Sequence, residues 1–264
     1  MLAARPMSIK TDRNFDDLAQ KFARKVYGEL KGDIRLAVIW RDLLAAVPGL
    51  ADGSSLRILD IGGGLGQLSI RTAELEHRVI YNDLSVEMLS LAQAEADKAK
   101  IKDKITCHQG EYQNLEDQLE GRFDLILCHA MAEWLAQPEQ LIARLEAMLA
   151  EKGTISLTFY NQHSLVYRNL IRGNFKVLEN PFEAHGGSLT PGTPLDPVLV
   201  EQWVADAGLH INSNTGIRVF HDYVTTQRGG HRDAASVIEM ELRYSLLEPY
   251  KAMGRYIHLL INRG

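Results

Sequence analysis

Short apolar runs alternate with helical patterns between residues 56 and 160. Runs typical of buried strands cover residues 56–61, 78–83, 104–110, 123–130 and 154–160. Between them, apolar residues recur every three to four positions over 67–75, 86–100 and 139–149, which is the period of an amphipathic helix. Ser85 is suited to cap the second of these helices, Pro138 to begin the third, and Gly153 to end it. This order predicts a parallel sheet with right-handed crossovers and with helices on both faces.

Further elements are expected on both sides of this core. Helical patterns at 14–27 and 33–47 precede it, and residues 161–196, rich in Asn, Gly and Pro, are typical of a cap or substrate loop. A helix at 199–208 and β-prone runs at 210–223 and 255–262 follow, with a helix at 233–247 between the two runs. The expected fold is therefore α/β, with a seven-stranded, mostly parallel sheet. The expected parts of a single domain over 1–264 are N-terminal helices (12–48), a core (54–160), a substrate loop (161–196) and a C-terminal helix and strands (197–264).

Composition narrows the class of protein. The chain has 264 residues, of which 45% are hydrophobic and 24% charged, as in ordinary globular proteins. No run of eighteen apolar residues occurs and the first residues lack a secretory pattern, so we expect a cytoplasmic protein without a membrane span. Cys107 and Cys128 lie far apart in apolar runs, which favours core filling and gives no metal site. The net charge of −5 excludes a uniformly basic coat but permits a local basic face.

A glycine run marks the end of the first core strand. Residues 62–66 read Gly-Gly-Gly-Leu-Gly, and such a run lets a ligand approach the backbone closely. The next strand ends at Asp83, seventeen residues after Gly66, where a carboxylate can accept hydrogen bonds from both hydroxyls of a ribose. The G-x-G-x-G spacing differs from the G-x-G-x-x-G of dinucleotide-binding oxidoreductases. A glycine-rich turn without function is the alternative interpretation.

This glycine run, with the acid on the next strand and the extra terminal strands, resembles the Rossmann-like class I S-adenosylmethionine methyltransferases. The resemblance implies that Glu111, Tyr112 and Gln113 flank the adenine and that His129, at the end of the fourth strand, lies near the methionine part. A buried structural role is the alternative for His129, and packing is the default role of Glu133 and Trp134.

Five blocks outside the glycine run carry a more specific resemblance. They read DRNFDDLAQKFARKVYGELKGDIR, HAMAEWLAQP, FYNQHSLVYRNLIRGNF, TGIRVFHDY and EPYKAMGRYIH. Together they are similar to bacterial tRNA 5-carboxymethoxyuridine methyltransferases (the CmoM family), over about residues 12–261 apart from a variable loop at 177–193. The resemblance implies methyl transfer from S-adenosylmethionine to the carboxylate of 5-carboxymethoxyuridine at wobble position 34 in a tRNA anticodon loop, giving a methyl ester. The cofactor-binding positions that match the family are Arg35, Gly62, Gly63, Asp83, Tyr112, Gln113 and His129.

No catalytic base, metal or activated cysteine is expected for this reaction, because a carboxylate is already ionised at neutral pH. Orientation and removal of water then supply the rate. The candidates for holding the acceptor are Tyr160, Arg168, His221, Tyr223 and Arg255, beside the neighbouring residues His163, Arg172 and Arg218. A surface charge or a core polar residue is an equally open interpretation for each of them.

One segment departs from the family. Relatives carry a lysine-rich stretch after the GNF block, whereas residues 177–193 here contain no Lys or Arg. Cations on the first helices are the alternative contacts for tRNA, namely Arg13, Lys21, Arg24, Lys25 and Lys31. Two other functions remain open at this point: methyl transfer to a small carboxylic acid or quinone-like metabolite, and S-adenosylmethionine binding without catalysis.

Overall fold

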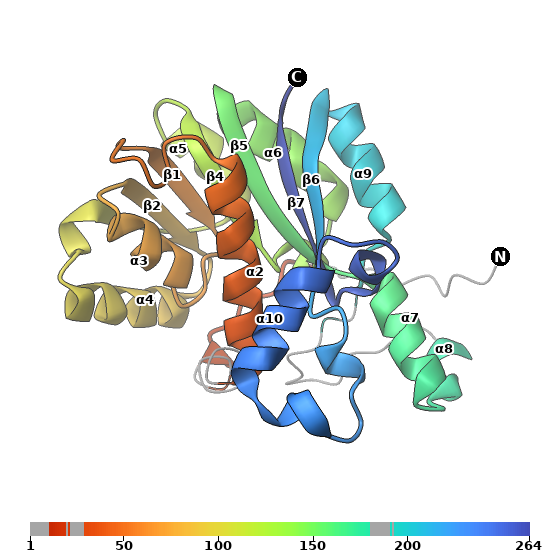
Figure 1. Cartoon of the computed structure of the whole chain (residues 1–264). Helices are drawn as coiled ribbons and strands as arrows, with labels where there is room; N and C mark the ends of the chain where they lie inside the picture. Colours follow the sequence, from red (N-terminus) through yellow and green to blue (C-terminus); the bar gives the residue numbers. More distant parts are fainter. Residues whose placement is uncertain (1–10, 20, 22–28, 180–190, 192) are drawn as a thin grey trace.

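A seven-stranded sheet forms the centre of the molecule in a computed structural model (Figure 1). The structure describes residues 11–19, 21, 29–179, 191 and 193–264. The strands lie in the order β3-β2-β1-β4-β5-β7-β6. Their bounds are β1 Arg57–Ile61, β2 Arg78–Asp83, β3 Ile105–Gln109, β4 Phe123–His129, β5 Leu149–Tyr160, β6 Leu209–Ile217 and β7 Tyr256–Arg263. Only β7 is antiparallel to its neighbours, so the prediction of a seven-stranded, mostly parallel sheet is confirmed.

Helices cover both faces of this sheet, as the alternating pattern predicted. They are α2 Leu30–Ala46, α3 Gln67–Ala73, α4 Val86–Ala99, α5 Leu115–Gln118, α6 Leu141–Met148, α7 Gln162–Ile171, α8 Phe175–Glu179, α9 Pro197–Asp206 and α10 Ala234–Tyr244. Short 3-10 helices lie between them, among which η2 Tyr112–Asn114, η3 Ala132–Trp134, η4 Pro138–Gln140, η5 His221–Tyr223 and η7 Tyr250–Met253 matter below. The Ser85 hydroxyl accepts a hydrogen bond from the Met88 N–H and caps α4, as expected.

Two apolar cores lie on opposite faces of the sheet because successive strand residues point to opposite sides. In β1, Leu59 and Ile61 belong to the core shared with α5, α6 and α9, whereas Ile58 belongs to the core shared with α2 and α10. The strand is buried on both faces, which explains why its sequence reads as a continuous apolar run.

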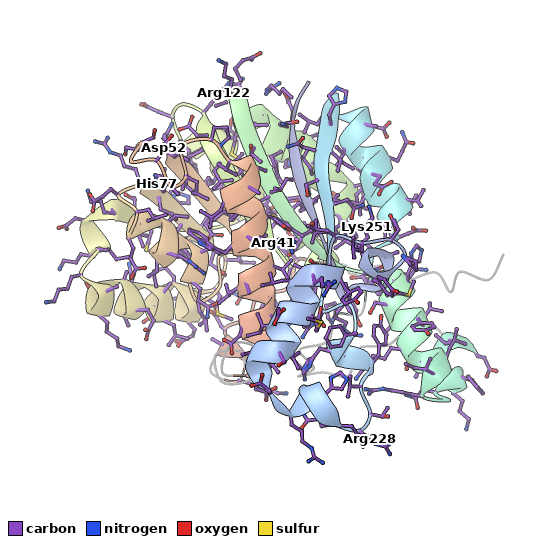
Figure 2. All side chains as sticks on the ribbon, in the orientation of Figure 1. Arg41, Asp52, His77, Arg122, Arg228 and Lys251 are labelled. Atoms are coloured by element: carbon purple, nitrogen blue, oxygen red, sulfur yellow. The ribbon has the colours of Figure 1, made fainter. Side chains whose placement is uncertain are left out.

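Helix α2 packs along one face of the sheet beside α10 (Figure 1). Its residues Ile34, Val38 and Leu43 are fully buried, and together they span a wide apolar face of the helix. Figure 2 shows Arg41 between α2 and α10, and its guanidinium donates hydrogen bonds to the main-chain oxygen of Leu242 at 2.6 Å and to Ser245 Oγ at 2.8 Å. The predicted N-terminal helix is thereby fixed to the C-terminal part of the chain.

A chain of buried polar side chains crosses the sheet from α2 to β4. Asp42 Oδ2 of α2 lies 2.8 Å from His258 Nδ1 of β7, and His258 Nε2 lies 2.8 Å from Ser156 Oγ of β5. Ser156 Oγ in turn lies 2.8 Å from His129 Nε2 at the end of β4. Although burial opposes it, the hydrogen bond from His258 and the guanidinium of Arg41 hold the pKa of Asp42 below its ordinary value. These contacts fix the antiparallel strand to its neighbours and set the orientation of the His129 ring.

Two predicted boundaries are wrong. Gly153 lies inside β5 and does not end a helix: α6 stops at Met148, and β5 makes a register shift against β4 at that point. A Cβ on Gly153 would lie 2.8 Å from the main-chain oxygen of Phe123, so the glycine serves close strand packing. The strand expected over 210–223 ends at Ile217, because the chain turns there into η5.

The segment expected to be irregular at 161–196 contains two helices, α7 and α8. The Asn161 side chain accepts a hydrogen bond from the His163 N–H and caps α7, a signal that the abundance of Asn and Gly concealed. The helix expected at 14–27 falls largely outside the described residues, as do Arg24 and Lys25.

Replacement of Asp42 by alanine tests the polar chain. Asp42→Ala leaves the buried His258 and Arg41 without their carboxylate, so we expect the free energy of unfolding to fall by about 3 kcal/mol. Chemical denaturation measures this change. The same substitution at Asp33, an exposed acid in the first turn of α2, serves as the control, with an expected change below about 1 kcal/mol. Equal effects of both substitutions would contradict the assignment.

Candidate active site

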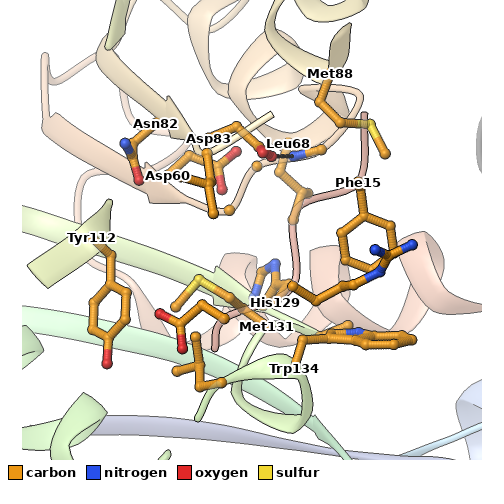
Figure 3. Close-up of a pocket in the computed structure, with 18 of the residues that line it drawn as sticks. Phe15, Asp60, Leu68, Asn82, Asp83, Met88, Tyr112, His129, Met131 and Trp134 are labelled. Atoms are coloured by element: carbon orange, nitrogen blue, oxygen red, sulfur yellow. Dashed lines mark hydrogen bonds between the residues drawn. The ribbon is translucent and has the colours of Figure 1, made fainter. Parts of the chain in front are cut away.

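A cavity of about 1070 Å³, partly open to solvent, lies at the carboxyl ends of β1, β2 and β4. Figure 3 shows Asp60 and Asp83 on one side of it and His129, Met131 and Trp134 on the other. All seven positions named from the sequence as cofactor contacts line this cavity: Arg35, Gly62, Gly63, Asp83, Tyr112, Gln113 and His129. Residues from three strands, from the loop and 3-10 helix after β3, and from α2 therefore meet at one site, as the open-sheet topology requires.

The glycine run makes a corner that other residues could not form. Gly62, Gly64 and Gly66 have φ values of +61°, +58° and +70°, the left-handed region in which glycine carries no Cβ penalty. Gly63 has no such torsion, but a Cβ there would lie 2.6 Å from the Tyr81 ring. The Tyr81 hydroxyl also donates a hydrogen bond to the Gly64 main-chain oxygen at 2.5 Å. The corner is thus closed from behind and presents bare backbone to the cavity.

Two carboxyl groups lie beside this corner, that of the buried Asp60 and that of the half-buried Asp83. Asp83 accepts hydrogen bonds from the N–H groups of Gly64 at 3.0 Å and Ser85 at 2.8 Å, while Asp60 accepts one from Ser69 Oγ at 2.6 Å. Burial raises the pKa of both Asp60 and Asp83 to about 6. At neutral pH both are mostly ionised, and Asp83 keeps acceptor capacity for a ligand with hydroxyl groups.

The part of the cavity near η2 contains an amide with spare hydrogen-bonding capacity. Gln113 Nε2 donates to Asp12 Oδ2 at 2.6 Å, but the buried Gln113 Oε1 has no hydrogen-bond partner among the described residues. Gln67 Oε1, at the start of α3, is also buried and also has no hydrogen-bond partner among the described residues. Tyr112 supplies an apolar ring wall and is only 6% exposed. The unpaired Gln113 acceptor beside the Tyr112 ring suits the amino group and flat face of a purine.

His129 and Arg35 give the cavity its second polar region. Burial, together with the nearby His258 and Arg35, holds the pKa of His129 well below its ordinary value, so this imidazole is neutral at physiological pH. Arg35 projects from α2, is 8% exposed and lies with its guanidinium carbon 5.5 Å from the centre of the Tyr256 ring. A buried guanidinium on the cavity wall suits a ligand carboxylate.

Residues 12–16 cross the mouth of the cavity, and sequence reasoning did not assign Asp12 or Phe15 to it. Asp12 accepts hydrogen bonds from Gln113 and from the Ala136 N–H at 2.8 Å, and Asp16 accepts one from Ser85 Oγ at 2.6 Å. The Phe15 and Trp134 rings meet edge to face with centroids 4.9 Å apart. Asp12 is the first residue of the block DRNFDDLAQKFARKVYGELKGDIR, so the resemblance of that block to the family was the one sequence feature that could have pointed to Asp12.

The acceptor candidates do not line this cavity, and the structure separates them into two groups. Tyr160, Arg168 and Arg255 lie together, with the guanidinium carbon of Arg255 4.5 Å from the centre of the Tyr160 ring. The Tyr223 hydroxyl instead bonds Ser164 Oγ at 2.7 Å and the Met253 main-chain oxygen at 2.6 Å. The His221 N–H donates to the buried Glu241, which fixes the turn after β6. The Tyr223 side chain thus has structural contacts of its own, whereas the contact of His221 is made by its backbone.

Metal and membrane features were searched over the described residues. That part of the chain contains no group of three or more His, Cys, Asp or Glu side chains that could hold a metal ion. None of its helices is both long enough and apolar enough to cross a lipid bilayer.

Comparisons with known proteins agree with this geometry. A family profile for a methyltransferase domain matches residues 58–153. The tRNA 5-carboxymethoxyuridine methyltransferase of Escherichia coli (strain K12) is 39% identical over 249 residues, which are 94% of this chain and 95% of the relative. The ubiquinone biosynthesis O-methyltransferase of Coxiella burnetii is 25% identical over 163 residues, or 61% of this chain and 66% of the relative.

A solved structure shares the fold at low sequence identity. The magnesium protoporphyrin IX methyltransferase from Synechocystis PCC 6803, with bound S-adenosylhomocysteine, superposes with a TM-score of 0.62 at 18% identity. The superposition covers 95% of this chain and 96% of that one.

Replacement of Gly63 by alanine tests the glycine corner. The added methyl group would lie 2.6 Å from the Tyr81 ring and 3.0 Å from Asp60 Cγ, so we expect the free energy of unfolding to fall by about 1–3 kcal/mol. Gly230→Ala is the matched control, because a Cβ there meets nothing within 4 Å, and its expected effect is within about 0.5 kcal/mol. Denaturant titration of both variants measures these free energies of unfolding. A Gly63→Ala protein of unchanged stability would contradict the close packing assigned to Gly63.

Proposed function

The chain belongs to the family of tRNA 5-carboxymethoxyuridine methyltransferases, and we propose that it methylates the carboxylate of 5-carboxymethoxyuridine at wobble position 34 of tRNA. The cofactor is S-adenosylmethionine and the product is the methyl ester. The main support for this proposal is the 39% identity over 94% of the chain. This similarity extends through the N-terminal and C-terminal additions as well as the cofactor-binding core. A protein that acts on tRNA is proposed to work in the cytoplasm.

The residues of the cavity fit the parts of S-adenosylmethionine. We assign Asp83 to the ribose hydroxyls, Tyr112 and Gln113 to the adenine, and the backbone of Gly62 and Gly63 to close contact with the nucleoside. Arg35 is assigned to the methionine carboxylate and His129 to the neighbourhood of the methionine chain. The unpaired Gln113 Oε1 and the spare acceptor capacity of Asp83 support this orientation. When bound, the cofactor supplies a sulfonium methyl group of high transfer potential.

The protein's own contribution is positioning rather than proton transfer. A carboxylate is ionised at neutral pH, so no general base is required to activate it. The neutral His129 adds no charge next to the sulfonium, and Asp60 and Asp83 supply negative charge in the same cavity. The apolar side chains of Phe15, Met131 and Trp134 keep water away from the reacting groups. Orientation and water exclusion are therefore proposed as the sources of the rate.

Small-molecule methyl transfer is the weaker alternative. The similarity to the ubiquinone biosynthesis O-methyltransferase covers 61% of the chain, whereas the similarity to the tRNA enzyme covers 94%. The additional segments thus follow the tRNA enzyme, and segments outside the cofactor core are where methyltransferases of one fold differ in substrate.

A methylation assay on purified tRNA tests the function. The purified protein, S-adenosylmethionine and tRNA from cells lacking this gene product are incubated, and the nucleosides are separated by mass spectrometry. We expect 5-carboxymethoxyuridine to disappear and its methyl ester to appear, gaining one methylene mass. Because tRNA binding is electrostatic, the KM for tRNA should rise steeply with salt concentration. Unchanged nucleosides with intact cofactor binding would overturn the tRNA assignment in favour of a small acceptor.

Asp83→Asn tests the assignment of the ribose contact. Loss of charged hydrogen bonds should weaken S-adenosylmethionine binding roughly tenfold to a hundredfold, as measured by calorimetry. Asp103→Asn, a charge change at an exposed position in η1, is the control and should leave the dissociation constant unaltered.

The affinity for S-adenosylmethionine should also depend on pH. With the pKa of Asp83 raised to about 6, acidification protonates the carboxylate that binds the ribose, so affinity falls as the pH drops. Between pH 7.5 and 5.5 the ionised fraction of such a group decreases roughly fourfold. Calorimetry across this range should show the decrease in the wild-type protein and a smaller one in Asp83→Asn, because Asp60 still titrates nearby. Identical pH profiles would show that Asp83 does not contact the ligand.

A further inference from the structure

A cluster of arginines lies beyond the carboxyl end of β5, outside the cofactor cavity. Arg168 comes from α7, Arg218 follows β6, and Arg255 precedes β7. They surround Asp222 of η5 and the ring of Tyr160, the last residue of β5. Three segments that are distant in sequence therefore bring guanidinium groups to one place.

Positive charge exceeds negative charge in this arginine cluster. Arg218 Nη2 and Arg255 Nε lie 3.6 Å and 3.5 Å from the same oxygen, Asp222 Oδ2. Arg172 donates only to the Asp222 main-chain oxygen, at 3.1 Å. Arg168 makes no hydrogen bond or ion pair with any residue that the structure describes.

The other charged groups nearby do not restore the balance. Lys31 acts on Asp222 as a further cation. The carboxylate of Glu241 is occupied by the N–H groups of Val219, Phe220 and His221. The carboxylate of Asp222, whose side chain is only 9% exposed, thus faces several cations. A second acid, Glu133, is buried next to Tyr160 and Arg35, and burial raises the pKa of Glu133 to about 7. Burial together with Arg255 lowers the pKa of Arg168.

Several polar atoms in the arginine cluster are buried and unpaired. Within the described residues, the donors Tyr160 Oη, Arg168 Nε, Arg218 Nε and Arg255 Nη1 have no hydrogen-bond partner, and they outnumber the one unpaired acceptor, Asp222 Oδ1. Tyr160 is 0% exposed and Arg255 is 7% exposed. Buried donors without acceptors are costly, so their arrangement is that of a site whose acceptor comes from a ligand.

The backbone holds these groups in place. The Asn161 N–H donates a hydrogen bond to the Arg255 main-chain oxygen at 3.1 Å. The Arg255 N–H donates one to the Arg218 main-chain oxygen at 3.3 Å. Arg218 itself is held at φ +59°, an uncommon torsion for a side chain of this size. The donors are therefore preorganised before any ligand arrives.

Tyr256 joins the arginine cluster to the cofactor cavity. Its ring centre lies 5.5 Å from the guanidinium carbon of the cavity residue Arg35 and 5.4 Å from that of Arg218. The Tyr160 and Tyr256 ring centres are 5.6 Å apart. The cluster thus adjoins the Arg35 and His129 end of the cavity, which is the end assigned to the methionine part.

We propose that Arg168, Arg255 and the Tyr160 hydroxyl bind the carboxylate of the methyl acceptor and position it for transfer. This inference rests on the proposed function and names the recognition site for its substrate. Guanidinium groups match a carboxylate geometrically, and the Tyr160 donor is too deeply buried for the ribose-phosphate backbone of a folded RNA. A carboxymethoxy group that extends from a flipped-out base is long and narrow enough to reach it.

Methyl transfer to the carboxylate requires no proton to be removed or added. A carboxylate oxygen forms a bond to the methyl carbon, the sulfur–methyl bond breaks, and its electron pair stays on sulfur. The anionic acid and the cationic sulfonium become a neutral ester and a neutral thioether. One acceptor oxygen is held by the arginines while the other attacks.

Arg168→Met and Tyr160→Phe test this inference, with Arg172→Met as the matched control on the same helix end. Neither test variant removes an observed hydrogen bond, so the proteins should fold, with thermal stability unchanged or raised. The kcat/KM for tRNA bearing 5-carboxymethoxyuridine should fall about a hundredfold in Arg168→Met and about tenfold in Tyr160→Phe. The dissociation constant of S-adenosylmethionine should stay within about twofold of wild type.

Binding measurements separate carboxylate recognition from phosphate contact. The probes are tRNA carrying 5-carboxymethoxyuridine and the same tRNA carrying 5-hydroxyuridine, which lacks the acid. Wild type and Arg172→Met should prefer the acid-bearing tRNA, and Arg168→Met should lose that preference. Equal weakening for both tRNAs, with a salt slope reduced by about one, would assign Arg168 to a phosphate and overturn the inference. The inference would also be overturned if the wild type is active and the test variants still prefer the acid-bearing tRNA. A wild-type protein that is inactive on tRNA would overturn the proposed function itself.

Discussion

The buried polar chain from Asp42 to His129 is the constraint on which the site depends. It joins α2, β7, β5 and β4 through three contacts of 2.8 Å. The side chains of Asp42 and His258 are only 4% and 0% exposed, so their contact is shielded from water. Because α2 also carries Arg35 and β4 ends at His129, the same contacts set the distance between these two cavity walls. An antiparallel strand between two others would otherwise be free to shift in register, and a polar pairing in an apolar sheet fixes that register.

Unpaired polar groups indicate where ligands belong in this molecule. Gln67 Oε1 and Gln113 Oε1 lack partners in the cofactor cavity, and Tyr160 Oη, Arg168 Nε and Arg255 Nη1 lack them in the arginine cluster. The first set consists of acceptors beside two carboxylates, and the second consists of donors that outnumber the unpaired acceptor Asp222 Oδ1. A cationic nucleoside suits the former and an anionic acceptor suits the latter. The two sites therefore differ in electrostatic sign in the way that a reaction between a sulfonium and a carboxylate requires.

The sequence predicted those features that depend on local geometry. The corner at Gly62–Gly66 and the acid at Asp83 follow from close backbone approach and from strand order, and both could be placed from a few residues. The pairing of Asp42 with His258 could not, because 216 positions separate them and nothing in either neighbourhood signals the other. The same holds for Asp12 and Gln113. The composition of residues 161–196 favoured an irregular loop. The structure instead contains α7 in this segment, capped by the Asn161 side chain and packed against its neighbours. Arg168 thus lies on a rigid element rather than on a mobile one.

In the proposed acceptor site, methylation also weakens the interaction between the arginine cluster and its ligand. Before transfer, the acceptor carboxylate offsets a positive charge that Asp222 alone does not neutralise. After transfer the ester carries no charge, so the guanidinium groups of Arg168 and Arg255 lose the ionic part of their interaction while their desolvation remains. The cofactor cavity loses charge at the same moment, because the thioether no longer attracts Asp60 and Asp83. The residues proposed to bind the acid and the sulfonium therefore hold the two neutral products less tightly.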